Sequence, residues 1–172
     1  MMRSVAIALL ACLLVAPCGS LATQAAAAKP SLLVADVGLV ELTPTDQRYD
    51  QAEDAARTAM LSKRIRASII ASGHYRVLDK GQDDRQPPYR YTDCKACIID
   101  WARKHGADYV LVTWVQKESR LILMVNMALI DVAHSDRQAT GGSVDLRGDT
   151  DETWLAGAAQ MLDRTLGVAM KP

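Results

Sequence analysis

The apolar run at residues 32–40 constrains the fold more than any other part of the sequence. It is rich in Val and Leu, and only Asp36 and Gly38 interrupt it. A short run of this composition is typical of a strand that is buried on both faces. The chain is therefore expected to build an α/β fold, in which helices pack against a sheet.

Three helices are predicted, at residues 50–72, 94–104 and 150–170. In the first, acidic residues occupy the early turns and basic residues the later ones, an order that complements the helix dipole. Gly73 and Gly106 are expected to end the first two helices. The apolar side of the first helix is expected to comprise Ala52, Ala55, Ala56, Ala59, Met60, Leu61, Ile65 and Ile69.

Further strands are predicted at residues 75–78, 109–115, 121–130 and 138–146. Residues 117–120 are interpreted as the turn of a hairpin, and Gly141 and Gly142 indicate a bulge or an edge position. The predicted order is βαβαβββα, with α+β character in the second half and a mixed sheet of about five strands with three helices. Residues 80–93, which contain Pro87 and Pro88, are predicted to form a surface loop.

Residues 1–28 are interpreted as a signal peptide. Arg3 is their one charge, and the apolar run at 5–16 is shorter than the roughly 20 residues that a membrane helix needs. Cleavage is expected after Ala22, Ala25 or Ala28, which leaves a single α/β domain at residues 29–172. The mature chain has no second apolar run long enough for a transmembrane segment, so a periplasmic location is expected.

A lipid anchor is less well supported than a cleaved leader. Cys18 follows Pro17, which fits a lipobox poorly, because a small residue is needed just before the modified cysteine. Cys12 has a better context, but it would leave an apolar region of only about eight residues, well short of a membrane span.

Charge and motifs together exclude several classes of function. The chain has 20 Lys+Arg and 20 Asp+Glu, so it lacks the basic excess of a nucleic-acid-binding protein. It contains no G-x-S-x-G, P-loop, H-E-x-x-H or G-x-G-x-x-G motif. These absences favour a non-enzymatic accessory protein without a cofactor, which binds a protein partner in the envelope or a small ligand.

Cys94 and Cys97 form the most chemically distinctive motif, at the expected start of the second helix. They are interpreted as a structural disulfide, and the alternative is a redox-active pair with a thiol pKa lowered by the helix dipole and Lys95. Haem attachment is excluded because Ile98 follows Cys97. A zinc site is disfavoured because His105 lies about 12 Å further along the helix, so His74 or His134 would have to complete it.

A cluster of acids precedes the last helix and comprises Asp145, Asp149, Asp151 and Glu152. It is interpreted as the start of that helix, with Asp149 or Thr150 as the N-cap, rather than as a site for calcium. No metal site is expected.

Two polar residues interrupt apolar strands, and three basic residues lie close together on the first helix. Asp36 and Asn126 could converge on a ligand pocket at a strand end, or could be satisfied locally. The bases Lys63, Arg64 and Arg66 are expected to form a solvated helix face, and the three histidines are expected to be exposed.

Two segments resemble secreted envelope proteins. Residues 73–79 (Gly-His-Tyr-Arg-Val-Leu-Asp) and 106–112 (Gly-Ala-Asp-Tyr-Val-Leu-Val) resemble a pattern in the amino-terminal domain of TolB and in the curli-secretion lipoprotein CsgG. The resemblance implies an α/β domain with a role in interaction or assembly. The chain lacks the β-propeller of TolB and the extra elements of the CsgG pore, so those functions do not carry over.

The carboxyl-terminal part resembles a second group. Residues 143–154 (Ser-Val-Asp-Leu-Arg-Gly-Asp-Thr-Asp-Glu-Thr-Trp) are similar to the end of a family of small secreted bacterial proteins of unknown function. That resemblance implies that this chain, like other members of the family, is encoded beside a periplasmic quinoprotein oxidation system.

Overall fold

A computed structural model describes residues 28–42, 51–81, 87, 93–119, 121–135, 137 and 140–170. Its elements are β1 (Ser31–Val34), β2 (Gly38–Glu41), α1 (Gln51–Ser72), β3 (Arg76–Val77), α2 (Lys95–Lys104), β4 (Tyr109–Lys117), β5 (Ile122–Asp131), β6 (Thr140–Arg147) and α3 (Asp151–Leu166). The predicted leader at 1–28, apart from Ala28, and most of the predicted loop at 80–93 lie outside the described residues.

The strands form one mixed sheet of six strands, in the order β3-β1-β4-β5-β6, with β2 also paired to β4. β1 pairs in parallel with β3 and β4, whereas β4, β5 and β6 form an antiparallel meander. The α/β prediction, with three helices and antiparallel character in the second half, is confirmed. β6 lies at an edge of the sheet, as its two glycines indicated.

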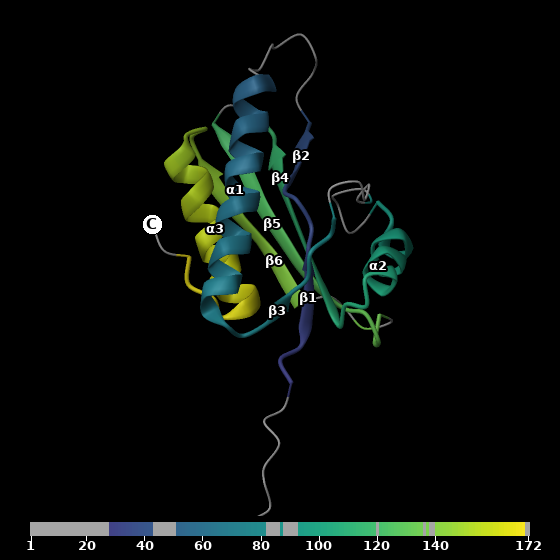
Figure 1. Cartoon of the computed structure of the whole chain (residues 1–172). Coiled ribbons are helices and arrows are strands. Elements are labelled where there is room, and N and C mark those ends of the chain that lie inside the picture. Colours follow the sequence, from purple (N-terminus) through teal and green to yellow (C-terminus); the bar gives the residue numbers. More distant parts are fainter. Residues whose placement is uncertain are drawn as a thin grey trace, which may run out of the picture.

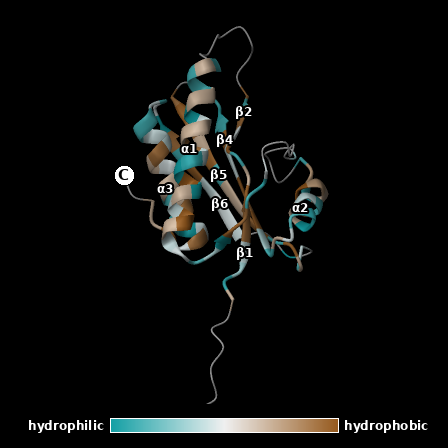
Figure 2. Ribbon diagram, viewed as in Figure 1, coloured by the Kyte–Doolittle hydropathy of each residue, from teal (hydrophilic) through white to brown (hydrophobic). Residues whose placement is uncertain are grey.

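Helices cover both faces of the sheet, α1 and α3 on one face and α2 on the other (Figure 1). Two hydrophobic cores result. The larger one lies beneath α1 and α3 and includes Leu32, Leu61 and Trp154, and the smaller one lies beneath α2 and includes Leu33, Ile98 and Val110. Figure 2 shows the apolar strands between the two helix layers.

The strand predicted at 32–40 is interrupted, which raises the strand number from five to six. Val34 pairs with Leu111 and Gly38 pairs with Trp114, so residues 35–37 lie opposite only two residues of β4. One extra residue in a strand is a β-bulge, which bends the strand and turns its hydrogen-bonding groups. Asp36 lies within this bulge and pairs with Lys80, so its charge stays outside the core.

Two predicted boundaries and the predicted apolar face of the first helix were wrong, for local reasons. The turn predicted at 117–120 begins one residue later, because Lys117 belongs to β4 and is buried. The last helix ends at Leu166 rather than 170, because Gly167 adopts a left-handed conformation with φ 62°. The alanines at 52, 55, 56 and 59 are exposed, and the buried side of α1 continues through Arg57 and Asp54 instead.

None of the described helices is long and apolar enough to cross a membrane. The longest, α1, is amphipathic: Leu61, Ile65 and Ile69 face the core, while the opposite side carries charged residues.

Candidate functional site

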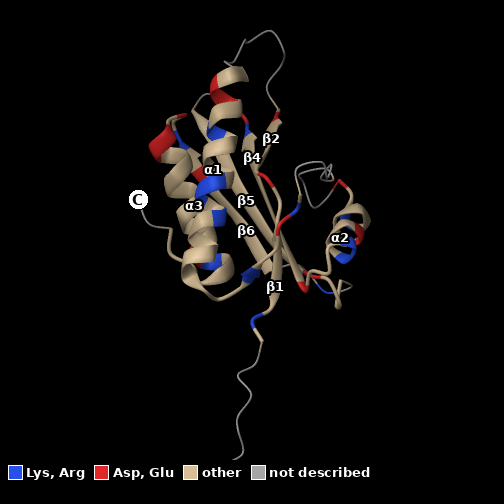
Figure 3. Ribbon diagram, viewed as in Figure 1, with Lys and Arg blue, Asp and Glu red and all other residues tan. Residues whose placement is uncertain are grey.

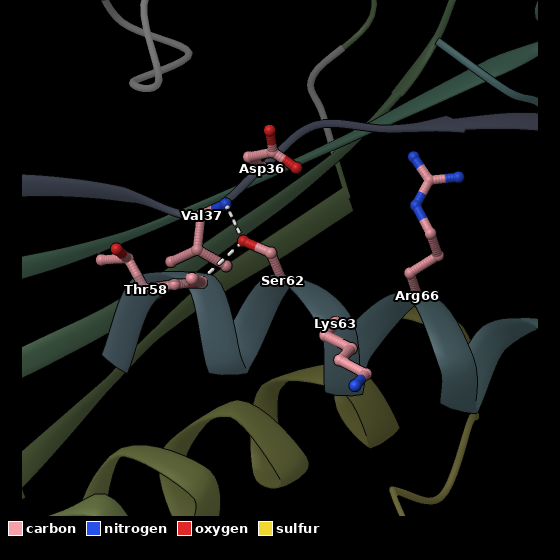
Figure 4. Close-up of a pocket in the computed structure, with 7 residues that line it drawn as sticks. Asp36, Val37, Thr58, Ser62, Lys63 and Arg66 are labelled. Carbon is pink, nitrogen blue, oxygen red and sulfur yellow. Dashed lines mark hydrogen bonds between the residues drawn. The ribbon is translucent and has the colours of Figure 1, made fainter. Parts of the chain in front are cut away.

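A pocket of about 450 Å³ lies between α1 and the bulge that joins β1 to β2 (Figure 4). It is lined by Asp36, Val37, Thr58, Ala59, Ser62, Lys63 and Arg66. The helical members fall into two neighbouring rows with four-residue spacing, 58-62-66 and 59-63, so one side of α1 forms the wall. Asp36 and Asn126 do not converge on this pocket: Asp36 lines it, and Asn126 is not among its described residues.

Two side chains of α1 hold the bulge in place. The Ser62 hydroxyl accepts a hydrogen bond from the Val37 amide at 2.8 Å and donates one to the Thr58 carbonyl at 2.7 Å. One turn later, the Arg66 guanidinium donates to the carbonyls of Val34 and Leu78 at 3.0 and 3.1 Å. Arg66 therefore closes the ends of β1 and β3, and the solvated face predicted for it was wrong.

The two remaining charged side chains of the pocket lie at its rim. Asp36 forms an ion pair with Lys80, which follows β3, so the pair joins the carboxyl ends of two parallel strands. The exposed Lys63 side chain extends from α1 away from the strand (Figure 4). Ligands of α/β proteins commonly bind at the carboxyl ends of parallel strands.

The polar groups of this pocket suit binding rather than bond-making chemistry. Its hydroxyls, Thr58 and Ser62, both donate to backbone carbonyls of α1. Among the described residues, neither hydroxyl has a hydrogen bond to a histidine or a carboxylate, the arrangement that activates a nucleophile.

A second cluster of charges lies inside the fold, where the first turns of α1 and α3 meet the end of β4. Figure 3 shows acidic residues at the start of both helices, at the same end of the molecule. The Lys117 ammonium is 1% exposed and lies 2.8 Å from both carboxylate oxygens of Asp54 and 2.7 Å from Asp149. Burial disfavours its charge, but these two carboxylates outweigh that effect and raise the pKa of Lys117.

Arg57 completes this internal cluster. Its guanidinium contacts Glu53, lies 3.0 Å from Asp151 and 3.3 Å from Asp149, and packs over the Trp154 ring. Burial opposes the charge of Arg57, but the hydrogen bond to Asp151 and the neighbouring carboxylates raise its pKa. With two bases among four acids, the cluster is an ion-pair network that joins three elements.

The predicted acidic cluster is divided by the structure. Asp149 and Asp151 belong to the ion-pair network, whereas Asp145 is exposed on β6. Thr150 is the N-cap of α3 and forms a capping box with Thr153. Glu152 is exposed in the first turn, where its own amide and the Thr150 hydroxyl lower its pKa.

The described residues contain no group of three His, Cys, Asp or Glu side chains able to hold a metal ion. His105 lies 2.8 Å from the Trp101 carbonyl and is half-buried, and His134 lies 3.0 Å from Asp131. Asn126 is buried on β5 and donates to the Met124 carbonyl at 3.4 Å, so it is satisfied locally.

Cys94 and Cys97 form a disulfide at the amino end of α2, with their Cα atoms 5.3 Å apart. Cys94 is the N-cap, and its sulfur accepts a hydrogen bond from the Cys97 amide at 3.2 Å. Cys94 is half-buried, whereas Cys97 is exposed.

The ion-pair network escaped prediction, although one signal for it was present in the sequence. The buried stripe of α1 at 61, 65 and 69 extends backwards to 57 and 54 at helical spacing, and those positions carry a base and an acid. Charged residues on a buried stripe require partners. The sequence alone does not identify Lys117 and Asp149 as those partners.

The chain belongs to a protein family described as "Protein of unknown function (DUF2380)", whose model matches residues 30–166. This confirms the predicted membership of a family of unknown function. No curated protein matches the chain by sequence.

Several solved structures are similar to this chain at low identity. They include the LpoB C-terminal domain from Escherichia coli, at 17% identity and a TM-score of 0.43, covering 73% of this chain and 86% of that one. The PelC dodecamer from Paraburkholderia phytofirmans has 18% identity and a TM-score of 0.44, with 79% and 86% covered. TolB from Acinetobacter baumannii has 10% identity and a TM-score of 0.47, with 83% and 29% covered. Similarity at this level carries no information about function.

Proposed function

We propose that this chain is a secreted periplasmic accessory protein without enzymatic activity, which acts by binding a protein partner in the envelope. The leader at residues 1–28 supports secretion. The first strand begins at Ser31 and the family model at residue 30, so cleavage after Ala28 removes no described strand or helix. On this proposal residues 29–172 form the mature single domain.

The observation that carries the binding role is the pocket between α1 and the bulge. It combines an open volume of about 450 Å³ with polar groups already fixed in position by the fold, as Ser62 and Arg66 show. Fixed groups around an open space lower the entropic cost of binding.

Substitution on the pocket wall tests this role. Ala59→Arg places a long charged side chain in the pocket, and Ala71→Arg makes the same change on an exposed site three turns further along α1. Both variants are expected to fold, as judged by circular dichroism. Cross-linking in the envelope measures partner binding. A protein that is cross-linked to the wild type and to Ala71→Arg should no longer be cross-linked to Ala59→Arg.

The resemblance of residues 143–154 makes components of a periplasmic quinoprotein oxidation system the first partners to examine. Recovery of the same protein in equal amount with all three forms would contradict a binding role for the pocket.

The exposed sulfur of Cys97 at a helix amino terminus favours a second candidate function, thiol–disulfide exchange. The reduction potential separates the two roles, since structural disulfides lie below about −300 mV and exchange proteins between about −270 and −120 mV. A Cys94→Ser, Cys97→Ser variant that loses some stability but keeps its partner would eliminate the redox function.

A further inference from the structure

We infer that the partner binds as an added strand, in extended conformation, along the outer edge of β2. This inference rests on the proposed function and specifies the class of partner that the same pocket receives: an extended peptide segment with a carboxylate at one end.

In the part of the chain that the structure describes, no strand pairs with the outer edge of β2, because the neighbouring strand β3 is short. β2 pairs with β4 on one side, and among the described residues no strand lies on its other side. β3 contributes only Arg76 and Val77, which pair with Ser31 and Leu32 at the start of β1. The described strands therefore leave the outer side of β2 unpaired, and the pocket residues Asp36 and Val37 directly precede this strand.

The direction of the backbone groups shows which residues of β2 are available. The Leu42 amide donates to the Lys117 carbonyl of β4. Hydrogen-bonding direction alternates along a strand, so the amides of Val40 and Gly38 also point toward β4, and those of Leu39 and Glu41 point away from it.

As far as the bulge, side chains of α1 already form hydrogen bonds with the outward backbone groups of this edge. The outward Val37 amide donates to Ser62, and the outward Val34 carbonyl accepts from Arg66. Among the described residues no hydrogen bond joins α1 to the strand beyond Val37, and Thr58 donates to the Ala55 carbonyl of its own helix. Leu39 and Glu41 are thus the residues that can pair with another backbone.

The pocket provides room for the side chains of such a strand. An added strand would lie about 4.8 Å from β2, with alternate side chains directed to the face that α1 covers. The wall of α1 at that place is built from Thr58, Ala59 and Ser62, which are small. Strand addition with side-chain pockets is an established mode of peptide recognition.

The charges at one end of the edge select a carboxylate. Arg66 lies beside the bulge, and two of its five N–H groups donate to the Val34 and Leu78 carbonyls, which leaves donors for a further acceptor. Asp36, the acid among the described residues of the pocket, is paired with Lys80. A carboxylate that reaches this end of the added strand gains charge-assisted contacts.

Nuclear magnetic resonance with synthetic peptides tests the inference on the mature protein. The probes are a hexapeptide of alternating Thr and Val that ends in an aspartate amide, one that ends in valine with a free carboxylate, and a neutral one that ends in valine amide. The amide signals of Leu39 and Glu41 should shift and exchange more slowly, and those of Ser143 and Asp145 on the β6 edge should not. Both carboxylate peptides should bind about fivefold more tightly than the neutral one. Whichever of the two binds more tightly shows whether the site prefers a side-chain carboxylate or a terminal carboxylate.

Two proline variants supply the controls. Glu41→Pro removes an outward amide and should abolish the shifts, whereas Glu41→Ala should retain them. Ser143→Pro makes the same kind of change on β6. The Gly148 amide donates to the Leu121 carbonyl, on the inner side of β6. Because hydrogen-bonding direction alternates along the strand, the Ser143 amide, five residues earlier, points outward. That variant should bind as the wild type does.

Shifts confined to β6, or no shift with any peptide, would overturn strand addition at β2 even if Ala59→Arg still abolishes partner capture. Equal affinity for all three peptides would overturn the carboxylate preference alone. Loss of the proposed function itself is recognised separately, by undiminished partner capture with Ala59→Arg.

Discussion

Lys117 is the residue whose replacement should be most damaging, because its ammonium neutralises a carboxylate that the fold has removed from water. Lys117→Met leaves Asp54, which is 3% exposed, with the more distant Arg57 at 3.6 Å as its one basic partner among the described residues. An unpaired buried charge costs several kcal/mol, so the free energy of unfolding should fall by about 3 kcal/mol. Urea denaturation measures the loss.

The double variant Asp54→Asn, Lys117→Met provides the control for that prediction. It removes the unpaired charge as well as the base, and Asp149 keeps Arg57 and the Trp154 indole as partners. More than half of the lost stability should return. A double variant less stable than Lys117→Met would show that packing, rather than charge, dominates at this position.

Asp108 links the start of β1 to the turn before β4, and this link should depend on pH. Hydrogen bonds from the Ser31 amide and hydroxyl, both 2.7 Å long, lower the pKa of Asp108 below 3.8. A carboxyl with a depressed folded pKa stabilises the fold fully above its unfolded pKa, and this contribution disappears as the pH falls through the folded value.

Asp108→Asn should therefore be less stable than the wild type at pH 7, and the difference should shrink as the pH falls below about 4. Urea denaturation at a series of pH values measures it. Ser31→Ala should show the same trend, and the double variant should lose less stability than the sum of the two single losses, because both changes remove the hydrogen bond between the Ser31 hydroxyl and the Asp108 carboxylate. A stability difference that is constant down to pH 2 would contradict this assignment.

Among the elements, the edge strand β6 depends on one of its two glycines and not on the other. Gly141 has φ 150°, and a Cβ atom there would lie 2.0 Å from the Met127 carbonyl oxygen of β5. Gly142 has no such strain, and its nearest neighbour would be the Met161 methyl at 3.9 Å. Substituting each of the two glycines by alanine therefore compares a position where a Cβ atom would collide with backbone with a neighbouring position where it would not.

Gly141→Ala should lower the free energy of unfolding by about 1–3 kcal/mol, because backbone must move. Gly142→Ala should change it by less than about 0.5 kcal/mol. Thermal unfolding of the two variants measures both values, and equal midpoints would refute the difference.

The sequence predicted elements well where one pattern decided them, and poorly where a distant partner did. Periodicity predicted the helices and the hairpin. Gly73 and Gly106 marked the ends of the first two helices, and the Thr150 cap marked the start of the last one. The bulge at 35–37 depends on pairing with β4 some 75 residues later. The pocket was foreseen only through Asp36, because Ser62 and Arg66 have ordinary helical positions, and their contacts with Val37 and Val34 arise from the crossover of α1.

For the whole molecule, removal of residues 1–28, the proposed leader, should leave stability unchanged. A chain that begins at Lys29 retains every described strand and helix, whereas one that begins at Leu33 loses Ser31 and its bonds to Asp108. The first should unfold at the wild-type temperature and the second several degrees lower. Differential scanning calorimetry compares the three chains, and a lower midpoint for the Lys29 chain would place part of residues 1–28 within the domain.

The position of β1 has a consequence for the order in which the chain can acquire its structure. β1 leaves the ribosome before every other element, yet its neighbours in the sheet are β3 and β4, and the latter begins at Tyr109. Contacts between segments so far apart in sequence form slowly. The amino-terminal two thirds of the chain therefore stay without a completed sheet during synthesis, and an unfolded chain is the form that the proposed secretion through a translocation channel requires.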